Sequence, residues 1–141
     1  MDEEPKVTIS IANCSGRSNI GQMSLEIAKK IDKTLPYANI NCLPAIFPKL
    51  KPAGKFFEAD AVVVIDGCSE ACVLKTIELA GLKPALRIAP DEDYGVEKRP
   101  GLDFDEETMN RIADDVIRKI EKLAEEIRQR KMRQAVEKAN V

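Results

Sequence analysis

Short apolar segments alternate with amphipathic segments along most of the chain. Residues 6–13, KVTISIAN, alternate apolar and polar positions with the period of two that is typical of a β-strand. Residues 59–66, ADAVVVID, form a continuous apolar run, which is typical of a parallel strand covered on both faces. Residues 38–43 and 85–90 are shorter apolar segments that we interpret as two further strands.

Helical periodicity lies between and after these strands. Apolar residues recur at helical spacing over residues 19–33, and Ser18 is a suitable N-cap. A second helix is predicted from Ser69 to Ala80, followed by Gly81 as the residue that ends it. A long helical pattern then begins near Asp105 and continues to the end of the chain, with acidic residues at its start and basic residues at its end, as the helix dipole favours.

Strands that alternate with helices predict an α/β fold, a three-layer sandwich with a mainly parallel sheet of the Rossmann-like or flavodoxin-like kind, and a long C-terminal helix. The apolar stripe of the last helix thins after Ile127. We therefore expect a single α/β domain over residues 1–127 and a basic helical tail over 128–141, which is a candidate surface for pairing two copies of the chain. Residues 44–57 contain three prolines and three lysines, and we expect a long loop there (Pro44, Pro48, Pro52; Lys49, Lys51, Lys55). Residues 91–101 are interpreted as a polar loop.

Composition narrows the classes of function. The net charge of −2 over 141 residues argues against a nucleic-acid-binding protein. No apolar run approaches the roughly 20 residues that span a membrane, and the acidic start MDEEPK is unlike a signal peptide, so we expect a cytoplasmic protein. The chain has no histidine, which removes Ser-His and Cys-His catalysis and all histidine-containing metal sites.

The four cysteines are the candidate functional residues. Cys14, Cys42 and Cys68 each follow a predicted strand, and Cys72 comes four positions after Cys68. All four therefore fall at the carboxyl edge of the predicted sheet, where ligands bind in such folds. In a reducing compartment, free cysteines form a shared metal site, act as catalytic thiols or are small buried residues. The sequence pattern is compatible with all three interpretations.

A tetrahedral zinc ion suits four thiolates. If a helix began at Ser69, Cys68 and Cys72 would lie one turn apart on the same side, near a helix N-terminus that favours thiolate. Asp66 would be repelled by thiolates, so we expect its carboxylate to turn toward backbone N–H groups or a basic residue. Arg17 and the lysines of the 44–57 segment are candidate cations near such a site.

Two other motifs are weaker. Residues 16–21 have the glycine spacing of a P-loop, but Gln22 and Met23 stand where Lys and Ser or Thr are required, so nucleotide hydrolysis is not expected. The acidic run 91–93 could hold a hard cation, although a solvated turn is the simpler interpretation.

Several short motifs together resemble the DGC domain family, which is named for its central Asp-Gly-Cys (Cys14-Ser15-Gly16, Cys42, Ile65-Asp66-Gly67-Cys68, Cys72, Gly81, Gly95-Val96-Glu97-Lys98). The resemblance covers about residues 7–100. It implies zinc binding through four chelating cysteines, which match Cys14, Cys42, Cys68 and Cys72, and the family has no established biochemical function. With every zinc position filled by protein, a structural, sensing or metal-handling role is the leading expectation. The alternatives are a thiol-based redox or sulfur-transfer enzyme and an iron–sulfur protein.

Overall fold

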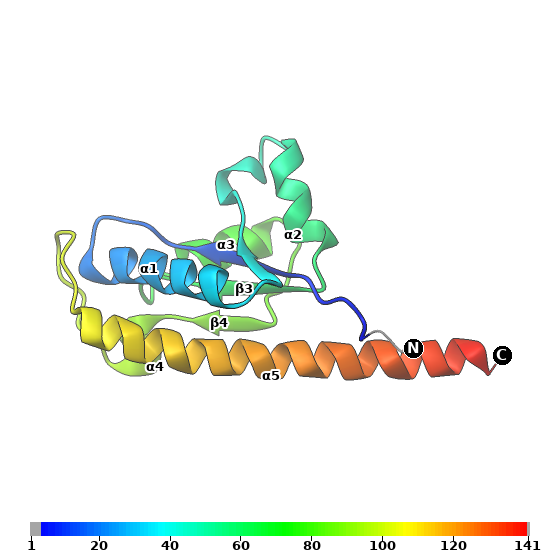
Figure 1. Ribbon diagram of the computed structural model, residues 1–141. Coiled ribbons are helices and arrows are strands. Elements are labelled where there is room, and N and C mark those ends of the chain that lie inside the picture. Colours follow the sequence, from blue (N-terminus) through cyan, green and yellow to red (C-terminus); the bar gives the residue numbers. More distant parts are fainter. Residues whose placement is uncertain (1–3, 141) are drawn as a thin grey trace.

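A four-stranded parallel sheet forms the centre of the molecule (Figure 1). The computed structural model describes residues 4–140. The strands are β1 (Ile9–Asn13), β2 (Ala38–Ile40), β3 (Ala61–Ile65) and β4 (Leu86–Ile88), in the order β2-β1-β3-β4. Each strand lies within a segment that the sequence predicts to be a strand. This is the strand order of flavodoxin-like sheets, in which the chain reverses its direction of winding between β1 and β3.

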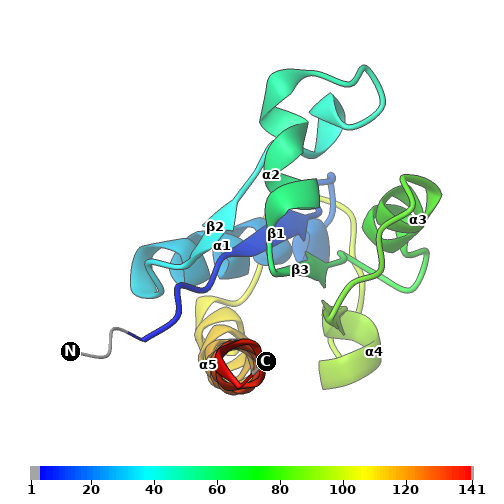
Figure 2. The same cartoon turned by 90° about the vertical axis from the view of Figure 1, so that its right-hand side faces the viewer.

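Helices cover both faces of the sheet, so the predicted three-layer α/β sandwich is confirmed (Figure 2). Alternate side chains of β1 and β3 point to opposite faces. Ile9, Ile11, Val63 and Ile65 pack against α1 (Asn19–Thr34) and α5 (Glu106–Ala139). Ala12, Val62 and Val64 pack on the other face, against α3 (Cys72–Leu79) and the segment that contains α2 (Gly54–Glu58).

The predicted starts of the two long helices are confirmed. The Ser18 hydroxyl accepts a hydrogen bond from the Gly21 N–H at 3.0 Å and caps α1. The Asp105 carboxylate accepts one from the Thr108 N–H at 2.9 Å and caps α5. Helix α5 then continues for 34 residues, and its C-terminal part extends beyond the sheet (Figure 1).

The prediction of a helix from Ser69 to Ala80 is wrong at its start. Helix α3 begins at Cys72, after a turn in which Ala71 adopts a left-handed conformation with φ of 58°. The Asp66 carboxylate accepts hydrogen bonds from the Val73 and Leu74 N–H groups, so these donors lie in the first turn of the helix. Cys68 therefore lies in the turn before the helix, and it is not one helical turn from Cys72.

Two segments interpreted as loops contain short helices. Helix α4 (Pro90–Tyr94) occupies the start of the 91–101 segment, with Pro90 at its first position and Gly95, φ 68°, at its end. Proline is favoured at the first helical position because its missing N–H would be unpaired there anyway. In and beside the 44–57 segment, 3₁₀ turns over Leu43–Ala45 and Lys51–Ala53 each have a proline as their second residue and precede α2.

Candidate functional site

Cys14 lies at the carboxyl end of β1, beside the carboxyl end of β3. Its backbone N–H donates to the Ile65 carbonyl at 2.9 Å, which extends the β1–β3 pairing by one residue. Its half-buried Sγ accepts a hydrogen bond from the Gly16 N–H at 3.3 Å. The Cys14 sulfur is therefore held at the point between β1 and β3 where ligands bind in flavodoxin-like folds.

Glycine residues keep the space around the Cys14 sulfur open, because they have no side chain. A Cβ at Gly67 would lie 3.0 Å from the Cys14 Sγ and 3.2 Å from the Gly21 Cα. A Cβ at Gly21 would lie only 2.5 Å from the Gly16 carbonyl oxygen. The glycine spacing that resembles a P-loop thus serves close packing between the β1–α1 loop, α1 and the turn after β3.

Cys68 follows Gly67 and faces a lysine from a distant part of the chain. The Lys98 Nζ lies 3.4 Å from the Cys68 Sγ. The hydrogen bond to this sulfur, together with the nearby carboxylate of Glu70, raises the pKa of the exposed Lys98 ammonium group. The ammonium group of Lys98 therefore lies within hydrogen-bonding distance of the Cys68 sulfur.

Asn19 fixes the loop that presents Lys98. Its buried side chain donates to the Glu97 carbonyl at 2.8 Å and accepts from the Arg99 N–H at 2.6 Å. The Asn19 backbone N–H also donates to the Arg99 carbonyl at 3.0 Å. Three hydrogen bonds from one residue therefore hold the two neighbours of Lys98.

The prediction for Asp66 is confirmed. Its carboxylate is buried, accepts from the Val73 N–H at 2.8 Å, and pairs with the Arg87 Nε at 2.9 Å. Arg87 also donates to the Cys68 carbonyl at 3.4 Å and pairs with Glu92 at 2.8 Å. Burial lowers the pKa of Arg87, but the hydrogen bonds to Asp66 and Glu92 outweigh it and raise the pKa overall. The Asp-Gly-Cys segment is thus bound to β4 and to α3 at once.

The three acidic residues after β4 form hydrogen bonds and an ion pair with other residues of the protein. The Asp91 carboxylate accepts from the Ser69 N–H at 2.9 Å, Glu92 pairs with Arg87, and Asp93 accepts from the Ala89 N–H at 2.7 Å. Each carboxylate therefore has a protein partner, and Asp91 anchors the turn that carries Cys68.

Cys42 and Cys72 are the two exposed cysteines. Cys42 comes two residues after β2, and Cys72 is the first residue of α3. All four cysteines are free thiols. The structure brings Cys14 and Cys68 to neighbouring strand ends, but within residues 4–140 no three Cys, Asp or Glu side chains are grouped closely enough to hold a metal ion. The set Cys14, Cys42, Cys68 and Cys72 stays a prediction.

Three residues of this region had no role in the predicted site: Asn19, Arg87 and Lys98. Lys98 is part of the Gly-Val-Glu-Lys motif, which is the one sequence signal that marks its segment. Asn19 and Arg87 act through contacts with residues far away in sequence. Arg17, a candidate cation, is exposed.

Comparison with known proteins gives one match. The sequence model of the DGC domain covers residues 10–116, which is more than half of the chain. Neither the curated proteins nor the solved structures gave a match. In the part of the chain that the structure describes, no helix combines the length and the apolar character needed to cross a membrane. The extent of the match and the Asp66-Gly67-Cys68 turn show that the chain belongs to the DGC domain family.

Proposed function

We propose that the chain is a cytoplasmic protein that binds one zinc ion through Cys14, Cys42, Cys68 and Cys72. The observation that carries this proposal is the position of the cysteines after β1, β2 and β3, which are adjacent parallel strands. Their carboxyl ends share one edge of the sheet, and the β1–β3 switch point lies between Cys14 and Cys68. Free thiols are donors that suit zinc.

The room around Cys14 supports this proposal. Gly67 leaves a space beside the Cys14 Sγ that any other side chain would fill. Lys98 would offset part of the negative charge that thiolates bring to a zinc centre. Asp66 directs its carboxylate to Arg87 and α3, so it adds no repulsion at the sulfurs.

Cys42 and Cys72 would have to approach the other two cysteines for all four to bind one ion, because no group of three ligands is formed among the described residues. Cys42 precedes a short 3₁₀ turn, and Cys72 follows the left-handed Ala71, so both lie at the ends of elements. Zinc would then bring the strand ends together, which suits a sensing or metal-handling role.

Elemental mass spectrometry tests this proposal on protein purified without oxygen or chelator. We expect about one zinc per chain, with four protein ligands. Each single Cys→Ser variant should lose most of the metal, whereas Ser69→Ala, a change in the exposed turn beside Cys68, should keep it. Full zinc content in Cys72→Ser would exclude this ligand set. A brown protein that contains iron and absorbs visible light would show an iron–sulfur cluster instead.

The contact between Lys98 and Cys68 favours a second candidate, thiol chemistry. The Cys68 thiolate would attack a disulfide of a partner to form a mixed disulfide, and Cys14 or Cys72 would then displace the second partner thiol. The partner disulfide is reduced to two thiols while two cysteines of this chain form one disulfide. Metal-free protein that reacts with alkylating agents no faster than an ordinary thiol would exclude this candidate.

A further inference from the structure

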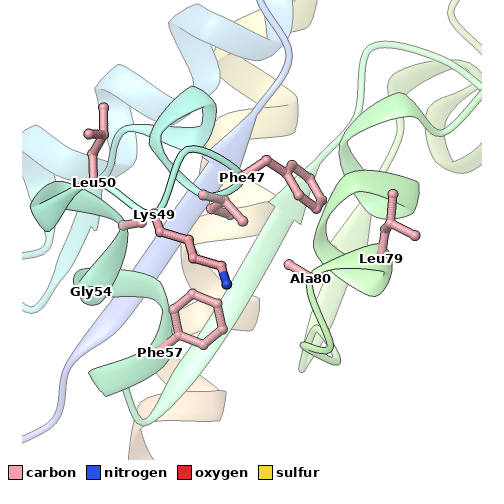
Figure 3. Close-up of a pocket in the computed structure, with 9 residues that line it drawn as sticks. Phe47, Lys49, Leu50, Gly54, Phe57, Leu79 and Ala80 are labelled. Atoms are coloured by element: carbon pink, nitrogen blue, oxygen red, sulfur yellow. The ribbon is translucent and has the colours of Figure 1, made fainter.

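A pocket lies on the face of the sheet away from α5, between the 43–58 segment and the end of α3 (Figure 3). Its volume is about 480 Å³, within the range of roughly 300–1,000 Å³ that small-molecule sites occupy. No cysteine lines it. This pocket is therefore separate from the proposed metal site.

The lining is apolar and accessible. Phe47, Leu50, Phe57 and Leu79 line the pocket and are 51%, 57%, 53% and 77% exposed. Large apolar side chains that lie together on a surface indicate a binding site more often than isolated ones do. Apolar contact would be the main contribution to binding here.

Lys49 is the one charged residue that lines this pocket in the described part of the chain. Figure 3 shows its side chain extending across the pocket toward Phe57. Among the ion pairs formed within residues 4–140, none involves Lys49. Its ammonium group is therefore available to an anion in the pocket.

The backbone of Lys49 is in the left-handed region, with φ of 59°. Residues with a Cβ rarely adopt this conformation, and glycine or asparagine would fit it more easily. Strained backbone conformations cluster at binding and active sites, so this conformation supports a role for the Lys49 side chain in binding.

We propose that this pocket binds a small amphiphilic carboxylate, with its apolar body against Phe47, Phe57 and Leu79 and its carboxylate paired with Lys49. Charge favours this occupant over a second copy of the chain. The 43–58 segment carries Lys49, Lys51 and Lys55 against the single acidic residue Glu58, so two such surfaces facing each other would repel.

Two probes with the same alkyl chain separate the apolar and charged contributions: decanoate and the neutral 1-decanol. Backbone amide shifts measured by NMR should respond saturably to decanoate at the non-proline residues of 46–57 and at residues 79–80. Lys49→Gln should weaken decanoate binding about two- to fivefold, as expected for an exposed ion pair, and leave decanol binding unchanged. Raising the salt concentration should weaken decanoate binding to the wild type only.

Three variants complete the test. Lys51→Gln removes a charge from the same segment but not from the pocket lining, and it should bind decanoate like the wild type. Lys49→Gly removes the ammonium group and relaxes the backbone, so it should weaken decanoate binding without loss of stability. Phe57→Ala should weaken binding of both probes.

Equal decanoate affinity in Lys49→Gln and the wild type would overturn the proposal. So would decanol binding as tight as decanoate binding, or the absence of saturable shifts. A concentration-dependent dimer that protects the same amides would assign this surface to a second copy of the chain. These measurements do not depend on zinc content, so their outcome is independent of the metal proposal.

Discussion

The buried carboxylate of Asp66 and the guanidinium group of Arg87 lie 2.9 Å apart and join the end of β3 to β4. Asp66 is 1% exposed and also accepts two N–H groups of α3. Asp66→Asn should lower the free energy of unfolding by about 2–4 kcal/mol, because it leaves Arg87 without its buried partner. Urea unfolding followed by circular dichroism measures this change.

Glu92→Gln is the matched control for that variant. It removes the other partner of Arg87, but the Glu92 side chain is 43% exposed, so the expected loss is below about 1 kcal/mol. Equal losses in the two variants would mean that burial of Asp66 contributes little.

The Lys98 ammonium group should accelerate reactions of Cys68. Lys98→Gln removes the cation that lies 3.4 Å from the sulfur, and alkylation of Cys68 in metal-free protein should slow about two- to fivefold at neutral pH. Peptide mass spectrometry after iodoacetamide treatment gives the rate, with Cys14 as internal reference. Lys75→Gln, an exposed lysine on α3, should leave the rate unchanged.

Asn19→Ala offers an independent check of this contact. The variant loses two side-chain hydrogen bonds to the neighbours of Lys98 while it keeps the lysine itself. Cys68 should then react more slowly although no charge has been removed. An unchanged rate would show that the loop holds its position without Asn19.

Gly67→Ala should destabilise the protein by about 1–3 kcal/mol, since its Cβ would lie 3.0 Å from the Cys14 Sγ and 3.2 Å from the Gly21 Cα. Thermal unfolding measures the loss. Gly54→Ala is the control, because the nearest atom would be 3.4 Å away in a flexible side chain and alanine favours the helix that Gly54 begins. Equal stability of the two variants would argue against close packing at Gly67.

The carboxyl group of Asp60 should make the free energy of unfolding depend on pH in the acidic range. Burial alone would raise the pKa of its carboxyl group, but hydrogen bonds from Lys131 and Thr8 outweigh burial and lower the pKa below its usual value. A depressed pKa in the folded state contributes stability that is present above the unfolded pKa of about 3.9 and is lost as pH falls through the folded pKa.

Urea unfolding between pH 7 and pH 3 tests this expectation against Asp60→Asn. The wild type should lose more stability than the variant as pH falls below about 4, because only the wild type has this carboxylate to protonate. Parallel pH profiles for the two proteins would contradict the prediction.

Deletion of residues 128–141 tests the proposed division of the chain. The tail meets the domain through surface contacts such as the Lys131–Asp60 ion pair at 2.8 Å, so residues 1–127 should still unfold cooperatively. If the tail pairs two copies through exposed Met132 and Val136, sedimentation should show a dimer for the full chain and a monomer for the deletion. A monomer in both cases would exclude this pairing.

Local patterns were enough to predict the sheet and the two long helices. The continuous apolar run before Asp66 marks a strand buried on both faces, and Ser18 and Asp105 mark helix starts through short-range caps. Because all four strands are parallel, the order of elements along the chain also predicts that Cys14, Cys42 and Cys68 follow strands at the carboxyl edge of the sheet.

Long-range contacts explain what local patterns could not predict. Helix α3 begins at Cys72 because the carboxylate of Asp66, seven residues before Val73, accepts a hydrogen bond from the Val73 N–H. Lys98 reaches Cys68 across 30 residues, through a loop fixed by Asn19. These contacts follow no sequence periodicity, since they depend on which strand ends become neighbours after folding.

The length of α5 has a consequence for motion in solution. Its 34 residues give a length of about 51 Å at 1.5 Å per residue, whereas a compact sphere of 141 residues, with a radius of gyration of about 14 Å, has a diameter of about 37 Å. A particle with such a long axis rotates faster about that axis than across it. Amide bonds in α5 lie nearly parallel to the axis, so their NMR relaxation should report slower tumbling than that of amides in the sheet.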